Sequence, residues 1–266
     1  QISPRPWFHH FVSVLLHLGN TLLLFFLLSR WATSRDLALS LAFLFLIHPG
    51  ISEAVYYVAA RNELLYVFFF LVVLFAVEWK SKGALILAPV AYLLCLLSKE
   101  SGLILLPALV LCVHRRVLTP ERKKGLYLGF LTACVLMYLG RRASGVAPHF
   151  SEVVSAAFHK DFWLVLVKYV ELLFLPFSPL GFRDRFLFTP HLLAWSVAAL
   201  ALIALGCAIR TRQKNRTLFE VSLLVLVPIL VLSSSVSFNF EYFADRYLYG
   251  AVMGFTMLIA SLNWKA

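Results

Sequence analysis

Ten apolar runs of 14 to 20 residues, joined by short polar connections, fill most of this chain. An α-helix rises 1.5 Å per residue, so about 20 apolar residues cross the hydrocarbon layer of a bilayer. Charged residues make up only 14% of the chain, against about 25% in an ordinary soluble domain. We therefore predict an all-α fold, a polytopic bundle of transmembrane helices. The apolar runs cover residues 10–29, 35–48, 64–79, 83–98, 101–114, 125–140, 162–177, 190–209, 217–235 and 245–262.

The basic residues are concentrated in a subset of the connections. With their flanking residues, these connections hold 14 of the 24 Lys and Arg residues but only four of the 13 Asp and Glu residues. Cytoplasmic loops of membrane proteins carry an excess of Lys and Arg, so this subset is predicted to face the cytoplasm. It consists of the connections 30–36, 79–83, 114–124 and 210–216, together with the C-terminus.

One apolar run must then fail to cross the membrane. Three runs separate the two most basic connections, 114–124 and 210–216, and an odd number of spans would put those connections on opposite sides. The run 162–177 contains Lys168 and Glu171, which share a helical face because they are three residues apart. We predict that it forms an interfacial or re-entrant helix on the outer side, which leaves about nine spans.

The remaining composition excludes several classes of protein. The net charge of +11 is divided among short loops, whereas nucleic-acid binding needs a continuous basic face, so we predict no nucleic-acid partner. No repeat of 20–50 residues and no linker is visible, so residues 1–266 are predicted to form one domain. The cysteines lie within apolar runs without metal-ligand spacing, which predicts small core residues and no metal site. They are Cys95, Cys112, Cys134 and Cys207.

Three polar clusters interrupt the apolar pattern on the predicted outer face. The connection 48–65 reads HPGISEAVYYVAARNELL, residues 98–102 read SKESG, and residues 243–249 read FADRYLY. Ionisable groups beside a bilayer are costly unless they are paired or functional. Their gathering on one face predicts a site there.

Each cluster has a structural and a functional interpretation. Glu53 and Arg61 are eight residues apart and would share a helical face, either as a neutral interfacial helix or as one wall of a cavity. Lys99 beside Glu100 is either a lysine extending to the interface or a cation that meets an anionic lipid head group. Arg246 beside Asp245 favours phosphate recognition, because guanidinium binds phosphate bidentately.

A polar stripe runs along the first apolar run. His10, His17 and Asn20 lie at helical spacing on it. Hydrogen bonds between helices explain such stripes most often, and no third metal ligand accompanies the two histidines.

In their order and spacing, four segments of the chain resemble a known family. They are FHHFVSVLLHLGNTLLLF at 8–25, HPGISEAVYYVAARNELL at 48–65, SKESGLILLP at 98–107 and ADRYLYGAVMGF at 244–255. The chain resembles the transmembrane, tetratricopeptide-repeat-containing protein O-mannosyltransferases and their bacterial relatives, within the C-type (GT-C) glycosyltransferase superfamily. The most specific elements are the HP…EAV…R-x-E-L-L and K-E-x-G patterns.

The resemblance implies a GT-C-like membrane enzyme. Such an enzyme takes a sugar, often mannose, from a polyprenyl-phosphate carrier and transfers it to a protein or glycan acceptor on the extracytoplasmic face. The carrier-linked sugar is then a substrate, no firm cofactor is implied, and assistance by a divalent cation stays open. The family's catalytic base is an acidic residue in a loop that would lie upstream of Gln1, and its repeats follow the membrane domain. We therefore expect this chain to be truncated at both ends relative to the family and inactive by itself.

The resemblance also implies roles for individual residues. Lys99 and Arg246 match the family's K-E and E/D-R-x-L-Y elements and would bind the donor phosphate, with Arg183 as a further candidate. The remaining polar residues of the clusters would shape the site, with the two early glutamates orienting the sugar or positioning Arg61. These site-shaping residues are His48, Glu53, Arg61, Glu63, Glu100, Asp245 and Tyr249.

Two other hypotheses stay open. One is a transporter or lipid flippase, which would need Gly- or Pro-broken helices and usually shows internal inverted repeats. The other is a non-catalytic assembly protein with the same fold. In every case the chain is expected to be a multi-pass integral membrane protein, with a bacterial inner membrane favoured over the endoplasmic reticulum.

Overall fold

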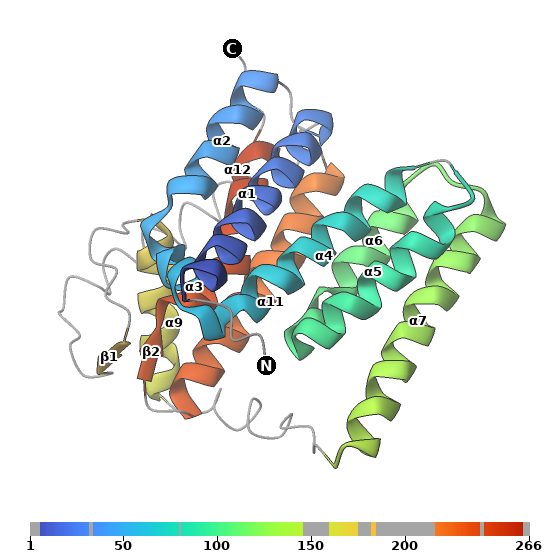
Figure 1. Cartoon of the computed structure of the whole chain (residues 1–266). Coiled ribbons are helices and arrows are strands. Elements are labelled where there is room, and N and C mark those ends of the chain that lie inside the picture. Colours follow the sequence, from blue (N-terminus) through green and yellow to red (C-terminus); the bar gives the residue numbers. More distant parts are fainter. Residues whose placement is uncertain are drawn as a thin grey trace.

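The computed structural model of the chain describes residues 6–31, 34–79, 81–145, 160–174, 182–184, 216–239 and 242–262. This part of the chain is almost entirely helical (Figure 1), which confirms the predicted helical class. Each longer helix overlaps one of the apolar runs, and the run 190–209 lies outside the described residues. The longer helices are α1 (Pro6–Trp31), α2 (Arg35–Ile47), α4 (Arg61–Glu78), α5 (Ala84–Ser98), α6 (Leu106–Arg115), α7 (Pro120–Ala143), α9 (Lys160–Phe174), α11 (Arg216–Asn239) and α12 (Tyr249–Ser261).

Short elements connect these helices at the end of the bundle where α4 and α12 begin (Figure 1). Two three-residue strands pair antiparallel there, with Arg183 opposite Phe243. The second strand leads directly into the turn that carries Asp245 and Arg246. The short elements are η1 (Pro49–Ile51), α3 (Ser52–Tyr56), η2 (Val58–Ala60), η3 (Glu100–Leu105), β1 (Phe182–Asp184), β2 (Tyr242–Ala244) and η5 (Asp245–Leu248).

Three helices of the described part are long and apolar enough to cross a membrane. They lie in α1, in α11 and over residues Val58–Glu78. A fourth span is added if α2 and the segment Pro49–Tyr56 are counted together, although the two are bent by 53°. This supports an integral membrane protein, and the number of about nine spans stays a prediction. The described helix α9 has 15 residues, and its interfacial or re-entrant placement stays a prediction.

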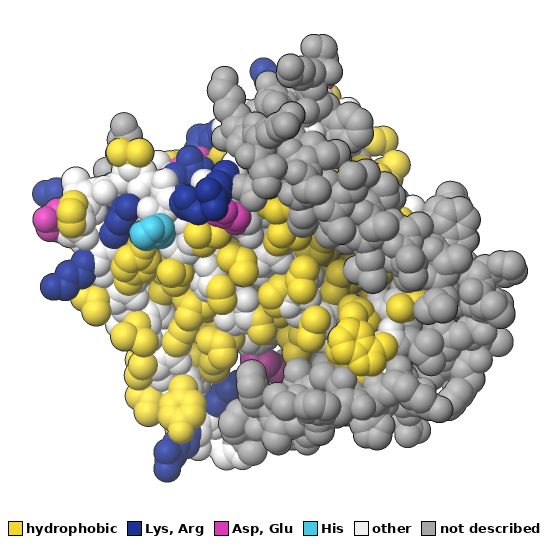
Figure 2. Space-filling model, turned by 180° about the vertical axis from the view of Figure 1, so that it is seen from behind, with side chains coloured by type: hydrophobic (Ala, Val, Ile, Leu, Met, Phe, Trp, Pro, Cys, Tyr) yellow, Lys and Arg dark blue, Asp and Glu magenta, His cyan; other side chains and the backbone are white. Residues whose placement is uncertain are grey.

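The surface of the molecule suits a lipid environment. Figure 2 shows a face whose middle is covered by hydrophobic side chains, with charged side chains towards its upper and lower edges. Large apolar side chains are widely exposed, among them Ile86 at 70% and Leu131 at 60%. Water-soluble monomers rarely expose such contiguous apolar area. The exposed side chains therefore fit contact with lipid tails.

Local sequence explains where two helices begin or end. α7 begins after Thr119, whose hydroxyl accepts a hydrogen bond from the Arg122 N–H, and Pro120 stands in the first turn, where its missing N–H costs nothing. α2 ends at Ile47 because Pro49 has no N–H to donate and disfavours helical geometry at His48. The first polar connection begins at His48, directly after this helix end.

The described connections meet at two ends of the bundle. At one end, Glu78 at the end of α4 pairs with Arg30 of α1 and with Arg116 after α6. Arg115 of α6 pairs there with Glu220 in the first turns of α11. Glu78 stands 15 residues after Glu63, a distance of about 22 Å along the helix. The described parts of the basic connections therefore meet at one end of the bundle, and the site lies at the other.

Candidate functional site

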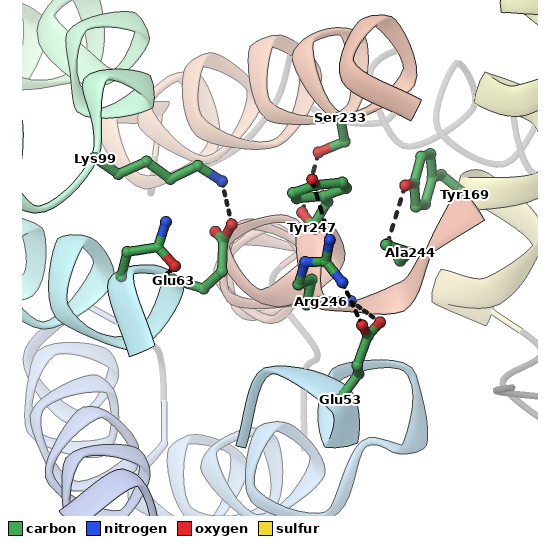
Figure 3. Close-up of polar contacts among 9 residues, drawn as sticks. Glu53, Glu63, Lys99, Tyr169, Ser233, Ala244, Arg246 and Tyr247 are labelled. Carbon is green, nitrogen blue, oxygen red and sulfur yellow. Dashed lines mark hydrogen bonds and ion pairs between the residues drawn. The ribbon is translucent and has the colours of Figure 1, made fainter. Parts of the chain in front are cut away.

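Three polar segments that are far apart in the sequence come together at the other end of the bundle (Figure 3). Glu53 lies in α3, Glu63 in the first turn of α4, Lys99 at the end of α5 and Arg246 in η5. The bend after α2 brings α3 against η5, and α4 and α5 pack side by side. Each predicted cluster thus contributes at least one charged residue to one site.

The first ion pair joins Glu53 to Arg246. One oxygen of the Glu53 carboxylate accepts from the Arg246 backbone N–H at 3.0 Å, and the other accepts from the guanidinium at 2.5 Å. The Glu53 side chain is 3% exposed and that of Arg246 is 11% exposed. Burial alone would lower the pKa of Arg246, but Tyr247 and Glu53 raise that pKa above its ordinary value. The guanidinium therefore keeps its charge in a largely dry place.

The second ion pair joins Lys99 to Glu63. The ammonium of Lys99 donates to one oxygen of the Glu63 carboxylate. The other oxygen of this buried carboxylate has no hydrogen-bond partner among the described residues. An ammonium has three N–H donors, and the contact with Glu63 uses one of them. Both groups thus retain capacity to bind a polar ligand.

Tyr247 lies between the two ion pairs (Figure 3). The Lys99 ammonium is 5.0 Å from the centroid of its ring, and the Arg246 guanidinium carbon is 4.9 Å from the same centroid. Ser233 of α11 donates to the backbone carbonyl of Tyr247 at 3.0 Å, which ties this turn to the bundle. Cations within about 6 Å of an aromatic face are attracted by it, so Tyr247 holds both cations in one group.

His48 supports the site without touching its charges. Its Nδ1 accepts from the Gly50 N–H, so its Nε2 carries the proton and donates to the Leu173 carbonyl at 3.3 Å. This contact attaches the first polar connection to the last turn of α9. Tyr169 of α9 donates to the Ala244 carbonyl at 3.0 Å. α9 therefore holds two of the three segments in place.

A buried hydrogen-bonded chain beneath the site involves Tyr249. His17 Nε2 donates to the Leu46 carbonyl at 3.0 Å, because a carbonyl only accepts, and this leaves Nδ1 to accept from the Tyr249 hydroxyl at 2.9 Å. Asn20 donates to that hydroxyl at 2.9 Å and to the Leu64 carbonyl at 3.0 Å. The predicted interhelical role of His17 and Asn20 is confirmed, whereas His10 is exposed.

Two of the predicted site residues, Arg61 and Glu100, pair outside the ion-paired group. Arg61 contacts the carbonyl and ring of His9, so the prediction that Glu53 or Glu63 positions it is wrong. Each glutamate instead pairs with a cation from another segment. Glu100 is 62% exposed and pairs with Arg141 of α7. Arg183 lies in β1, and its side chain is outside the described part of the structure.

The other predicted residues sit within or beside the group. Asp245 is 1% exposed and precedes Arg246 in η5. Three aromatic residues that the sequence interpretation did not select also belong to the site. The centroid of the Tyr66 ring is 5.5 Å from the Lys99 ammonium, and that of the Tyr57 ring is 5.4 Å from the Arg246 guanidinium carbon. The third is Tyr247, whose ring lies near both cations. Tyrosines are common near membrane interfaces, so their positions in the sequence carried no specific signal.

The group as a whole is buried, charged and nearly balanced. Lys99 pairs with Glu63 and Arg246 with Glu53, and the buried Asp245 precedes Arg246 in η5. Interactions between charges and hydrogen-bonding groups are stronger in such a water-poor place than at the surface. The arrangement can orient a polar ligand and stabilise charge that develops on it.

Comparison of the chain with protein-family models, with curated proteins and with solved structures gives no match.

Proposed function

We propose that this chain is the membrane domain of a glycosyltransferase that uses a polyprenyl-phosphate sugar as donor. The sugar, often mannose in the family that the sequence resembles, would pass to a protein or glycan acceptor on the extracytoplasmic face. The observation that carries the proposal is the meeting of Lys99 and Arg246 around Tyr247, each held by a buried carboxylate.

The two cations suit the leaving group of this reaction. Negative charge grows on the carrier phosphate as the bond to the sugar breaks, and fixed cations in a water-poor site stabilise that charge. Lys99 has N–H donors beyond the one that binds Glu63, and the planar guanidinium of Arg246 has the geometry that matches phosphate oxygens. In this proposal Lys99 and Arg246 bind the phosphate, and the carboxylates hold the cations in position before the substrate arrives.

The proposal extends to the membrane arrangement. The site would open on the outer side of a GT-C-like bundle of about nine spans, with α9 as its interfacial or re-entrant helix. The basic end at Glu78 would face the cytoplasm, following the charge distribution of the loops. A bacterial inner membrane is the location we favour. Arg183 is a further candidate for the phosphate, since β1 pairs with the strand that precedes Arg246.

Transfer measured in membranes tests this proposal. Lys99→Ala and Arg246→Ala, made in the intact protein, are expected to reduce transfer from polyprenyl-phosphate mannose at least about tenfold. The matched control is Arg141→Ala, which removes a cation from the exposed pair with Glu100 at the same end. The assignment fails if both site variants insert normally and retain wild-type transfer, or if the control loses as much.

A second candidate function, a lipid or solute transporter, is favoured by one observation. α2 and the segment Pro49–Tyr56 are bent by 53° at the His48–Pro49 break, and broken helices are typical of transporters. Flux through proteoliposomes distinguishes the two functions. Transfer of sugar without net movement of lipid or solute supports the enzyme, and the reverse result supports the transporter.

A further inference from the structure

A second charged group lies at the opposite end of the bundle and is centred on Glu78. The carboxylate of Glu78 accepts from Arg30 at 3.3 Å, and also from Arg116 and from the indole N–H of Trp31. The guanidinium of Arg116 also lies 4.8 Å from the centroid of the Trp31 ring. Two guanidinium groups face one carboxylate, so this group carries net positive charge.

An apolar cavity of about 140 Å³ lies next to this charged group. It is formed where α1, α4 and α5 meet near the Glu78 end of the bundle. A cavity of this size with apolar walls stays dry and accepts an apolar group about as large as benzene. Its lining residues are Leu23, Val72, Phe75, Ala76, Trp79 and Leu87.

Arg30 connects the cavity to the charged group. Its guanidinium carbon is 4.4 Å from the centroid of the Phe75 ring, and Phe75 is part of the cavity wall. The Arg30 side chain is 48% exposed, so its guanidinium is accessible from outside the bundle. Trp79, which is 49% exposed, also lines the cavity. Tryptophan prefers the level of the lipid head groups, which puts the cavity just inside the hydrocarbon layer.

We propose that this cavity and Arg30 form a binding site for one anionic phospholipid. A segment of its acyl chain would occupy the cavity, and its phosphate would bind the exposed side of the Arg30 guanidinium. Arginine binds phosphate through paired N–H groups, and contact with Glu78 uses one Nη1 donor of the five that the side chain has. The excess positive charge favours a head group with net negative charge over a zwitterionic one. Lys82, exposed in the connection from α4 to α5, adds to that preference.

Lipid competition on the purified full chain tests the site. The delipidated protein is mixed with equal amounts of phosphatidylglycerol and phosphatidylcholine that carry the same acyl chains, and retained lipid is measured by mass spectrometry. We expect retention of phosphatidylglycerol to exceed that of phosphatidylcholine by about fivefold, the effect of roughly one cation near a lipid phosphate. Arg30→Gln should bring the ratio close to one.

The matched control is Arg35→Gln. Arg35 is exposed at the same end of the bundle and also lies over an aromatic ring, that of Phe25 at 5.9 Å, but neither residue lines the cavity. Arg35→Gln should keep the wild-type ratio of retained phosphatidylglycerol to phosphatidylcholine. The proposal is overturned if Arg30→Gln leaves this ratio unchanged. It is also overturned if Arg35→Gln lowers the ratio as much as Arg30→Gln does.

A second variant covers the case in which Arg30→Gln fails to fold because its contact with Glu78 is lost. Leu87→Trp changes a cavity residue that is 38% exposed, so the larger ring can fill the cavity while Arg30 keeps its contacts. It should reduce retained phosphatidylglycerol severalfold at an unchanged melting temperature in detergent. Wild-type retention by Leu87→Trp overturns the site. If the wild-type protein retains phosphatidylglycerol and phosphatidylcholine equally, the role of charge is overturned.

Discussion

Arg246 binds both oxygens of the Glu53 carboxylate, one through its backbone N–H at 3.0 Å and one through its guanidinium at 2.5 Å, although 193 residues separate the two in the chain. The double contact fixes the backbone of η5 as well as the Arg246 side chain. The first polar connection and the start of α12 are thereby held in one geometry. Loss of this double contact should lower the stability of the protein and displace Arg246 from its position in the site.

Glu53→Ala is therefore expected to destabilise the protein strongly. Removing one partner of a buried ion pair typically costs about 3–5 kcal/mol, because the remaining charge is left buried and unpaired. Thermal unfolding in detergent measures the effect. Glu100→Ala is the control, because Glu100 is exposed in its pair with Arg141 and should cost less than about 1 kcal/mol. Equal losses for the two variants would contradict the buried geometry.

The pair of Lys99 and Glu63 should show strong coupling in a double-mutant cycle. Lys99→Met alone leaves the Glu63 carboxylate buried without its cation, whereas adding Glu63→Gln removes the charge that needs a partner. We expect the double variant to be more stable than Lys99→Met alone, with a coupling of about 1–3 kcal/mol between the two sites. Additive effects in unfolding would show that the two side chains do not pair.

His17 should be neutral, with its proton on Nε2. The Leu46 carbonyl accepts from Nε2, and Nδ1 accepts from the Tyr249 hydroxyl, so only this tautomer satisfies both contacts. Nitrogen NMR of histidine-labelled protein identifies the tautomer. Tyr249→Phe removes the donor to Nδ1 and should destabilise the protein by about 1–3 kcal/mol. A protonated Nδ1 on His17 in the wild type would refute this hydrogen-bond order.

Gly250→Ala tests the close packing of α12 on α4. A β-carbon at this position would overlap the Tyr66 hydroxyl and approach Ile229 to 2.9 Å. We expect a loss of about 1–3 kcal/mol, the usual cost of overpacking, and partial recovery when Tyr66→Phe is added. Gly140→Ala in α7 is the control, because nothing lies within 4 Å of its β-carbon. Since alanine favours helix over glycine, Gly140→Ala should be neutral or stabilising.

Accessibility labelling tests the arrangement of the two ends. Ser81 lies in the α4–α5 connection beside the Glu78 end, Ser144 lies at the far end of α7, and both are exposed. In a variant without the native cysteines, Ser81→Cys and Ser144→Cys should react with a membrane-impermeant maleimide from opposite sides. The predicted orientation puts Ser144 outside. Labelling of both from one side would exclude α5, α6 and α7 as three successive crossings.

Much of the architecture follows from local sequence. The apolar runs predicted the helices to within a few residues, because a long apolar segment in lipid has to satisfy its backbone hydrogen bonds internally. The run 101–114 was the main exception. Its first part forms the 3₁₀ helix η3, and Pro107 stands in the first turn of α6. Gly102 packs closely there, since a β-carbon would lie 2.9 Å from the sulfur of Cys95.

The sequence by itself determined that the chain is helical and apolar, that the described parts of its basic loops share one end, and that Glu53, Glu63, Lys99 and Arg246 lie in polar connections. Only the tertiary structure decided the partners. Spacing along the chain paired Glu53 with Arg61, but the bend after α2 turns Glu53 towards η5, and Arg61 faces His9 instead. A charge that is buried takes the partner that packing brings within reach, and that partner need not be a neighbour in sequence.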